Sequence, residues 1–302
     1  MRALLAVLAL AALTAGCGSS TSRSERGAPR AGSLEGLWKS SGQAVALIPG
    51  TNDYSPGEVR ISFLVVDNRG RVIAPPTARF WIARSLSAKP FQETVAKLQP
   101  VGVPGVSTGA DVPALYVAHV RVAAPGKYYV LARPIGKVAI GGIHDIVVRV
   151  RSATPAVGDR AYASRTPTLA SSGGKTAKLT TRVPPDRGLL RYSIAESLAV
   201  HAPFIVTFAT PRYCESRTCG PVVDVVEHER RRFEGSGIRF IHVEIYKDND
   251  PRQGQNRWVR QWRLPSEPWT FLVGRDGRIK AKFEGSLSAK ELRSAVESKL
   301  LA

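Results

Sequence analysis

The stretch that decides how the second half of this protein folds is TPRYCESRTCGPVVDVV, residues 210–226. It contains Cys214 and Cys219, two of the three cysteines in the 302-residue chain, with four residues between them. The dense apolar run 204–208 before it predicts a strand, and Pro221 opens a pattern that predicts a helix to Phe233. We therefore expect the two cysteines to lie where a strand passes into a helix.

Further along the chain, strands and helices continue to alternate. Residues 238–246 predict a strand, and 269–273 and 278–283 flank a Gly-containing turn that predicts a β-hairpin. Ser288, with Glu291 three residues later, predicts the capping box of a last helix that ends near Leu300.

Two segments of this half resemble the thioredoxin family. PFIVTFATPRYC, residues 203–214, is similar to its passage from strand to active site, and LPSEPWTFLVGRDGRI, residues 264–279, is similar to its cis-proline and hairpin. The resemblance covers about residues 189–300 and is closest to exported, membrane-anchored members of the superfamily. It implies an α/β thioredoxin-like fold, with Pro268 as the cis-proline that faces the cysteines.

The first half has a different period. In EVRISFLVVDNRGRVI, residues 58–73, apolar side chains alternate and then meet a turn at Asn68-Arg69-Gly70, and further short β-rich runs follow to residue 150. The stretches SPGEVRISFLVVD and APGKYYVLA resemble paired strands of immunoglobulin-like domains. The predicted fold class is therefore an all-β immunoglobulin-like sandwich over 34–150 and a thioredoxin-like domain over 187–302, joined by a Ser-, Thr- and Pro-rich linker over 151–186.

The N-terminus predicts export. Arg2 precedes an apolar run over 3–13, too short for a spanning helix, and LTAGC at 13–17 resembles a bacterial lipobox. We interpret 1–17 as a signal peptide that makes Cys17 the lipidated N-terminus, and 18–33 as a flexible tether. An ordinary secretory signal with a chance cysteine is the alternative. Either reading places the protein outside the cytoplasm, where disulfides persist, and lipidation places it on the outer face of the cell membrane.

The formal net charge of +19 is large, but the basic residues are scattered along the chain. A nucleic-acid-binding protein would need a clustered basic face or a recognisable binding module, and neither is present in the sequence, so we expect no nucleic-acid partner. Attraction to an anionic membrane surface, or solvated arginine without a specific role, accounts for the charge.

The cysteine pair predicts a thiol–disulfide oxidoreductase with a CxxxxC site. A thiolate at the start of a helix is stabilised by the helix dipole, and Arg212 and Arg217 would add to this effect if they point inward. Counting from the strand favours Cys214 as the attacking cysteine, whereas Cys219-Gly220-Pro221 resembles the family's Cys-Gly-Pro; we favour Cys214. Thr207 replaces the family's buried acidic residue.

Two alternatives remain open from the sequence. The pair could be a structural disulfide in a non-enzymatic binding or scaffold lipoprotein, or a copper site like that of the copper-chaperone relatives. The latter use a histidine late in the fold, whereas the last histidine here, His242, lies early and within a predicted strand. We expect no cofactor and no metal site, and exported proteins with thiols or disulfides as partners.

Overall fold

The computed structural model describes residues 28–105, 112–136 and 139–302; Cys17 and the expected signal peptide lie outside these ranges. The first half begins with helix α1, Leu34–Lys39, capped by Ser33. Its strands are β1 Gln43–Pro49, β2 Gly57–Val66, β3 Thr77–Ala83, β4 Gln92–Pro100, β5 Ala114–Val122, β6 Gly126–Pro134 and β7 Ile140–Val148.

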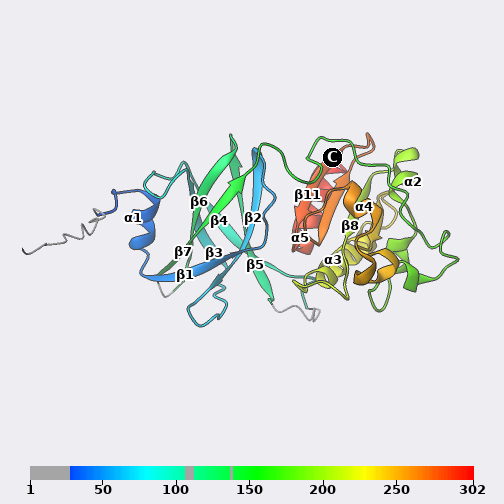
Figure 1. Ribbon diagram of the computed structural model, residues 1–302, viewed down its shortest axis with the longest axis horizontal. Helices are drawn as coiled ribbons and strands as arrows, with labels where there is room; N and C mark the ends of the chain where they lie inside the picture. Colours follow the sequence, from blue (N-terminus) through cyan, green and yellow to red (C-terminus); the bar gives the residue numbers. More distant parts are fainter. Residues whose placement is uncertain (1–27, 106–111, 137–138) are drawn as a thin grey trace, which may run out of the picture.

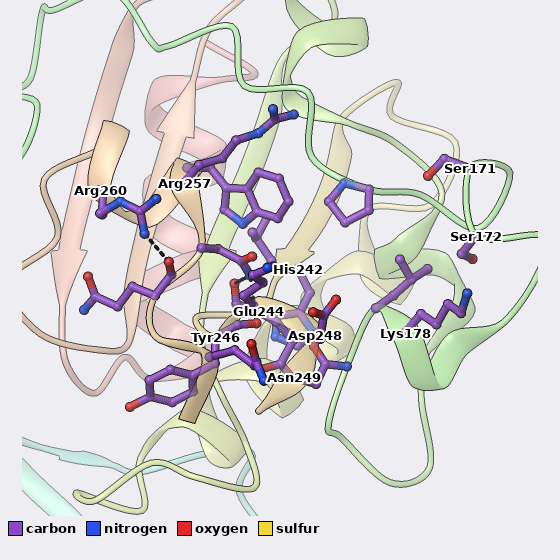
Figure 2. Close-up of a pocket in the computed structure, with 18 residues that line it drawn as sticks. Ser171, Ser172, Lys178, His242, Glu244, Tyr246, Asp248, Asn249, Arg257 and Arg260 are labelled. Atoms are coloured by element: carbon purple, nitrogen blue, oxygen red, sulfur yellow. Dashed lines mark hydrogen bonds between the residues drawn. The ribbon is translucent and has the colours of Figure 1, made fainter. Parts of the chain in front are cut away.

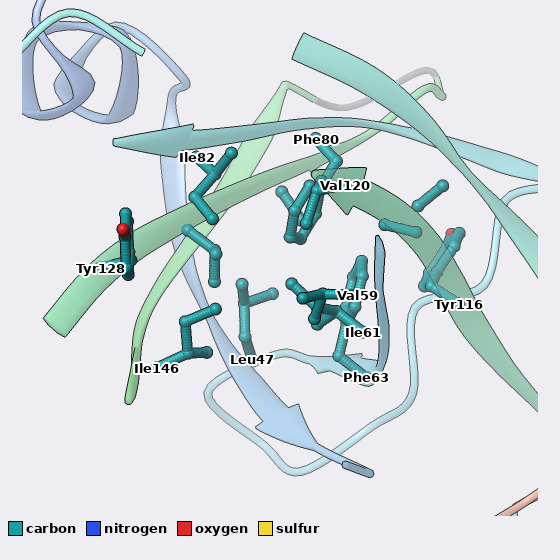
Figure 3. Close-up of a cluster of buried hydrophobic side chains, with 14 of the residues drawn as sticks. Leu47, Val59, Ile61, Phe63, Phe80, Ile82, Tyr116, Val120, Tyr128 and Ile146 are labelled. Carbon is teal, nitrogen blue, oxygen red and sulfur yellow. The ribbon is translucent and has the colours of Figure 1, made fainter. Parts of the chain in front are cut away.

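These seven strands form a closed barrel in the order β1-β2-β5-β4-β3-β6-β7. The alternation read from the sequence of β2 sets its inner face, because successive side chains of a strand point to opposite sides. Val59, Ile61, Phe63 and Val65 are all buried in the barrel interior. Figure 3 shows Val59, Ile61 and Phe63 among side chains from the other strands. The Phe63 ring stacks on those of Phe80 and Tyr116.

The barrel closes at a parallel seam between β1 and β7. At this seam Val45 lies opposite Gly142, where a Cβ atom would come within 2.6 Å of Leu47 Cδ2 and 3.0 Å of the Val45 carbonyl oxygen. Gly141 is equally crowded by Ser41. The two adjacent glycines therefore allow the first and last strands to approach closely enough to pair.

The second half is built on a four-stranded sheet in the order β11-β10-β8-β9, in which only β8 and β9 are parallel. Its strands are β8 Phe204–Phe208, β9 Arg239–Val243, β10 Trp269–Val273 and β11 Ile279–Glu284. Its α-helices are α2 Ile194–Ala199, α3 Cys219–Arg232, α4 Arg257–Gln261 and α5 Ala289–Lys299. Short 3-10 helices are η1 Thr176–Lys178, η2 Arg187–Leu190, η3 Lys247–Asn249 and η4 Pro251–Gln253.

Side chains of β8 alternate between two cores, one on each face of this sheet. Ile205 packs with the apolar faces of α3 and α5, whereas Phe204, Val206 and Phe208 pack with residues of α2 and α4, including Trp262 directly after α4. The strand is buried at every position, which explains why four of its five residues are apolar. Its end, at Phe208, delivers the chain into the cysteine loop.

The barrel and the sheet lie side by side, with β2 and β5 nearest to β11 and α5 (Figure 1). Arg60 of β2 forms an ion pair of 2.8 Å with Glu291 of α5. Lys282 of β11 reaches Asp53 in the loop between β1 and β2, and Asp53 also accepts a hydrogen bond from the backbone of Ala153. Charged groups that are largely removed from water therefore connect the two halves.

The fold class predicted from the sequence is wrong. The first half is not an immunoglobulin-like sandwich of two stacked sheets, because β1 pairs with both β2 and β7 and closes one barrel. Across the described residues the protein is mostly β, with this barrel, a small four-stranded sheet and five α-helices, and we therefore do not assign an α/β thioredoxin-like domain or membership of that family. The resemblance rested on local motifs and on the order of elements, which do not fix how strands close into sheets.

The segment 151–186, interpreted from its composition as a linker, packs against the second half. Gly158 donates its backbone N–H to Ile279 of β11, and Arg182 pairs with Asp224 of α3 at 2.8 Å. Thr181 donates from its hydroxyl to Glu244, directly after β9. This segment thus supplies walls for the sites described below.

Candidate functional site

The two cysteines lie in the passage from β8 to α3. Cys219 is the first residue of α3, and Cys214 lies in the loop before it. Both are free thiols in this structure and both are buried, but Cys214 is 8% exposed whereas Cys219 is fully covered. Of the two cysteines, only Cys214 is therefore in part accessible.

The loop between the cysteines is held by short-range hydrogen bonds. The backbone N–H of Arg217, which has a positive φ of 53°, donates to the Cys214 carbonyl oxygen at 3.2 Å. The Ser216 hydroxyl lies 3.3 Å from Cys214 Sγ and 2.8 Å from the Thr218 hydroxyl. The four-residue spacing is thus accommodated by a turn that brings the Cys214 sulfur back to the beginning of α3.

The electrostatics of the two thiols differ strongly. A hydrogen bond from Cys219, followed by bonds from Ser216 and from the backbone N–H groups of Cys219 and Thr218, outweighs burial and lowers the pKa of Cys214 to about 6. Burial, together with its hydrogen bond to Cys214, raises the pKa of Cys219. The unpaired N–H groups at a helix start favour negative charge, so α3 stabilises a Cys214 thiolate.

From the sequence, Arg212 and Arg217 were expected to stabilise the thiolate further if they point inward. The low pKa of Cys214 instead depends mainly on hydrogen bonds, the one from Cys219 above all. The Arg212 guanidinium lies over the ring of Tyr213, 5.5 Å from its centroid. Tyr213 in turn packs edge-to-face on Tyr246. The aromatic pair therefore forms one side of the loop.

Pro268 and Glu267 lie directly before β10. The Glu267–Pro268 peptide bond is cis. Burial, and the negative charges of Cys214 and Glu215, raise the pKa of Glu267, and its charge acts on Cys219 as well. The coupling of Glu267 to both thiols depends on how the two loops meet, for which the sequence carries no signal.

Thr207, which replaces an acidic residue in the resemblance, is fully buried and shares a hydrogen bond of 3.0 Å with Thr270 of β10. Its hydroxyl group cannot act as a base at neutral pH, unlike the carboxylate that it replaces. Glu267 is therefore the acidic group that the structure couples to the thiols.

His242 does not belong to the thiol site. Its Nδ1 lies 3.2 Å from the Thr180 hydroxyl and its Nε2 lies 3.1 Å from the Ala209 carbonyl oxygen, so both ring nitrogens have partners. Within the described ranges, no group of three or more His, Cys, Asp or Glu side chains is arranged to hold a metal ion.

A pocket of about 730 Å³ lies beside the loop and shares Tyr246 with it. Its walls are residues of 167–179, the end of β9 with Glu244, and residues of 246–260. Figure 2 shows Glu244 between Lys178 on one side and Arg257 and Arg260 on the other. Sequence reasoning missed this pocket because it treated one of its walls as a linker.

No protein-family model matches this chain, and no curated protein matches it either.

Cys17, the expected lipidation site, lies outside the described residues. In the part of the chain that the structure describes, no helix has the length and apolar character needed to cross a membrane.

Proposed function

We propose that this protein exchanges thiols and disulfides with exported proteins through Cys214 and Cys219. The observation that carries the proposal is the asymmetry of the pair: the pKa of the partly accessible Cys214 is about 6, whereas the pKa of the covered Cys219 is raised. The thiolate form of a cysteine is the nucleophile in disulfide exchange. A neighbouring thiol that stays protonated reacts only in the second step, when it resolves the mixed disulfide. This division of roles favours Cys214 as the attacking residue.

The reaction proceeds in two steps. The Cys214 thiolate attacks one sulfur of a partner disulfide, forming a mixed disulfide and releasing the other partner sulfur as a thiolate. Cys219 then loses its proton and attacks Cys214 Sγ, which forms the Cys214–Cys219 disulfide and releases the second partner thiolate. Two electrons pass from the dithiol to the partner, and the reverse sequence oxidises a partner dithiol.

We assign Glu267 as the base that accepts the proton of Cys219. The pKa of Glu267 is raised, so this carboxylate binds a proton more tightly than an ordinary carboxylate does. Its proton affinity is thereby closer to that of a thiolate.

The cellular setting is part of the same proposal. The apolar run before Cys17 and the sequence LTAGC support export and lipid anchoring on the outer face of the cell membrane. The exchange needs no cofactor, since the two cysteines supply both electrons. A Cys17→Ala variant is expected to leave the membrane fraction, and its retention there would contradict the anchor.

Trapping of partners tests the exchange. Cys219→Ser should accumulate mixed disulfides with exported proteins through Cys214, because the resolving sulfur is absent. Cys214→Ser is the matched control and should trap none. If neither variant traps a partner, and the wild-type disulfide resists physiological reductants, then the pair is a structural disulfide and the proposal is wrong.

A further inference from the structure

A buried histidine is connected to Cys219 through a single peptide unit. His242 lies on β9, and Phe240 on the same strand belongs to the apolar core that contains both cysteines. Because alternate residues of a strand share a face, His242 points to the same side of the sheet as α3. Its Nε2 lies 3.1 Å from the Ala209 carbonyl oxygen, at the exit of β8. His242 therefore meets the chain directly before the cysteine loop.

The partners of His242 define its protonation state. A carbonyl oxygen only accepts hydrogen bonds, so Nε2 carries the proton and donates it to Ala209. Burial lowers the pKa of His242 and keeps the ring neutral, so Nδ1 is an acceptor. The Thr180 hydroxyl, 3.2 Å away, therefore donates to Nδ1. Thr180 Oγ1 in turn accepts a hydrogen bond from the Arg182 backbone N–H at 3.1 Å.

The Ala209 carbonyl and the Thr210 N–H belong to one peptide unit and point in opposite directions. Burial raises the pKa of Cys219 most, and the Thr210 N–H acts against burial by donating to the Cys219 sulfur. The Ala209 N–H donates to the Val243 carbonyl oxygen at 3.1 Å, which fixes the residue on the near side of this unit. A hydrogen bond accepted at the peptide oxygen strengthens the donor at the peptide nitrogen.

We propose that His242 is a positioning residue for the second step of thiol exchange, because it holds the 209–210 peptide unit with its N–H directed at Cys219 Sγ. The inference rests on the proposed exchange reaction, in which Cys219 gives its proton to Glu267 and attacks Cys214 Sγ. The bond between the two cysteines forms as the bond from Cys214 to the partner breaks, and the partner sulfur leaves as a thiolate. While Cys219 carries the negative charge, the peptide N–H stabilises it.

The role of His242 is orientation and not proton transfer. The charged groups that act on its ring are Glu244, which raises its pKa, and Arg182, which lowers it, and burial outweighs both. Those that act on the Cys219 sulfur are Cys214 and Glu267. His242 lies outside the thiol site, and a ring that stays neutral donates the same hydrogen bond throughout the reaction.

The test is the reaction of the reduced full chain with one equivalent of dithiobis(nitrobenzoate), a small aromatic disulfide. Attack by Cys214 releases one coloured thionitrobenzoate, in a phase whose rate depends on the concentration of the probe. Attack by Cys219 on the mixed disulfide releases the second, in a phase whose rate does not. Stopped-flow absorbance separates the two phases, so each cysteine is measured by itself.

Replacement of His242 should slow the second phase alone. In His242→Leu we expect this phase to slow by about threefold to tenfold. A lost hydrogen bond to a charged sulfur reduces the thiolate population, and the higher nucleophilicity of the more basic thiolate restores only part of the rate. The rise of this rate with pH should move to higher pH, whereas the first phase should stay within about twofold of the wild type. His242→Gln, which retains a side-chain N–H donor, should recover most of the rate.

Two further variants separate this effect from folding. Ile241→Val removes one methylene from the other face of β9, so it should lower stability without slowing the second phase. Thr180→Val removes the donor to Nδ1 and should slow the second phase, but less than His242→Leu does. If His242→Leu does not fold, Thr180→Val decides between the outcomes.

The outcomes for this inference and for the exchange reaction are distinguishable. A second phase that is unchanged in His242→Leu, or in Thr180→Val where His242→Leu does not fold, would overturn the inference and leave the exchange intact. Slowing by Ile241→Val equal to that by His242→Leu would also overturn it, since a general loss of packing would then account for both. Absence of the second phase from the wild type would overturn the exchange and this inference together.

Discussion

Arg60 in the barrel and Glu291 in the last helix form a two-bonded ion pair across the junction of the two halves. Arg60 Nε and Nη2 donate to the two carboxylate oxygens at 2.8 and 3.2 Å, and the side chains are only 11% and 12% exposed. Arg60 also donates to the Ser286 carbonyl oxygen and lies over the ring of Phe283. One side chain of β2 therefore contacts three positions on the β11–α5 segment.

Replacement of Arg60 tests the weight of this junction. Arg60→Met leaves the Glu291 carboxylate covered and without its cation, so we expect the free energy of unfolding to fall by about 3 kcal/mol. Urea denaturation measures it. Arg121→Met is the matched control, because the Arg121–Glu58 pair is 76% and 70% exposed, and it should change stability by less than about 1 kcal/mol.

The pH dependence of thiol alkylation tests the site. In the reduced protein, the rate of reaction of Cys214 with iodoacetamide should rise with pH to a plateau, with a midpoint near the pKa of about 6. In Cys219→Ala the midpoint should move to higher pH, because the largest cause of the low pKa is removed; Ser216→Ala should move it less. A wild-type midpoint near the ordinary thiol value of 9.0 would contradict the asymmetry of the pair.

Asp53 makes the stability of the junction between the two halves depend on pH. Burial opposes the charge of Asp53, but hydrogen bonds from Ser152, Ala153 and Thr154 and the charge of Lys282 outweigh it and lower its pKa below 3.8. A lowered carboxyl pKa contributes stability above the unfolded value, and this contribution is lost as the pH falls through the folded value. The stability difference between the wild type and Asp53→Asn should therefore shrink between about pH 5 and pH 2.

An exposed aspartate provides the comparison for this prediction. Asp145 pairs with Lys127 on the barrel surface at 3.2 Å, with both side chains about half exposed. Asp145→Asn should leave the free energy of unfolding within about 0.5 kcal/mol of the wild type at neutral pH. Equal effects of the two substitutions would show that the buried network contributes nothing special.

Gly142 tests the closure of the barrel. A side chain there collides with Leu47 and with the backbone of Val45 across the seam, so Gly142→Val should lower the free energy of unfolding by about 3 kcal/mol or prevent closure. Gly220 in α3 has open space around its Cα, and Gly220→Ala should raise stability by up to about 1 kcal/mol. Circular dichroism during thermal unfolding distinguishes the two; equal stability of Gly142→Val and wild type would contradict the seam.

Particular residues show how far the sequence led. The alternation of Val59, Ile61, Phe63 and Val65 predicted the inner face of β2 correctly, and the Ser288–Glu291 capping box is present at the start of α5. Local patterns carry such information because they depend only on neighbouring residues.

Closure of the barrel was missed for the opposite reason. β1 and β7 pair over about a hundred positions of sequence, and a sandwich and a barrel have the same strand-to-strand alternation. The adjacent Gly141 and Gly142 were the available signal, since paired glycines within a strand indicate a close approach of backbones.

The pocket was not predicted, because the composition of residues 151–186 was interpreted as that of a linker without fixed structure. Residues 151–186 are rich in Ser, Thr, Pro and Gly, yet Thr180 and Thr181 are fixed by His242 and Glu244. The partners of these hydroxyl groups lie more than sixty residues away, so no local pattern reveals them.

The same segment has one more consequence. The outer edge of β11 would otherwise present free backbone groups, and such an edge can recruit strands from other copies of a protein. Gly158 and Asp159 pair with Ile279 on that edge, and Ala161 bonds to Gly277 beside it. Residues 158–161 therefore occupy the edge at the start of β11, where a strand from another copy of the protein could otherwise pair.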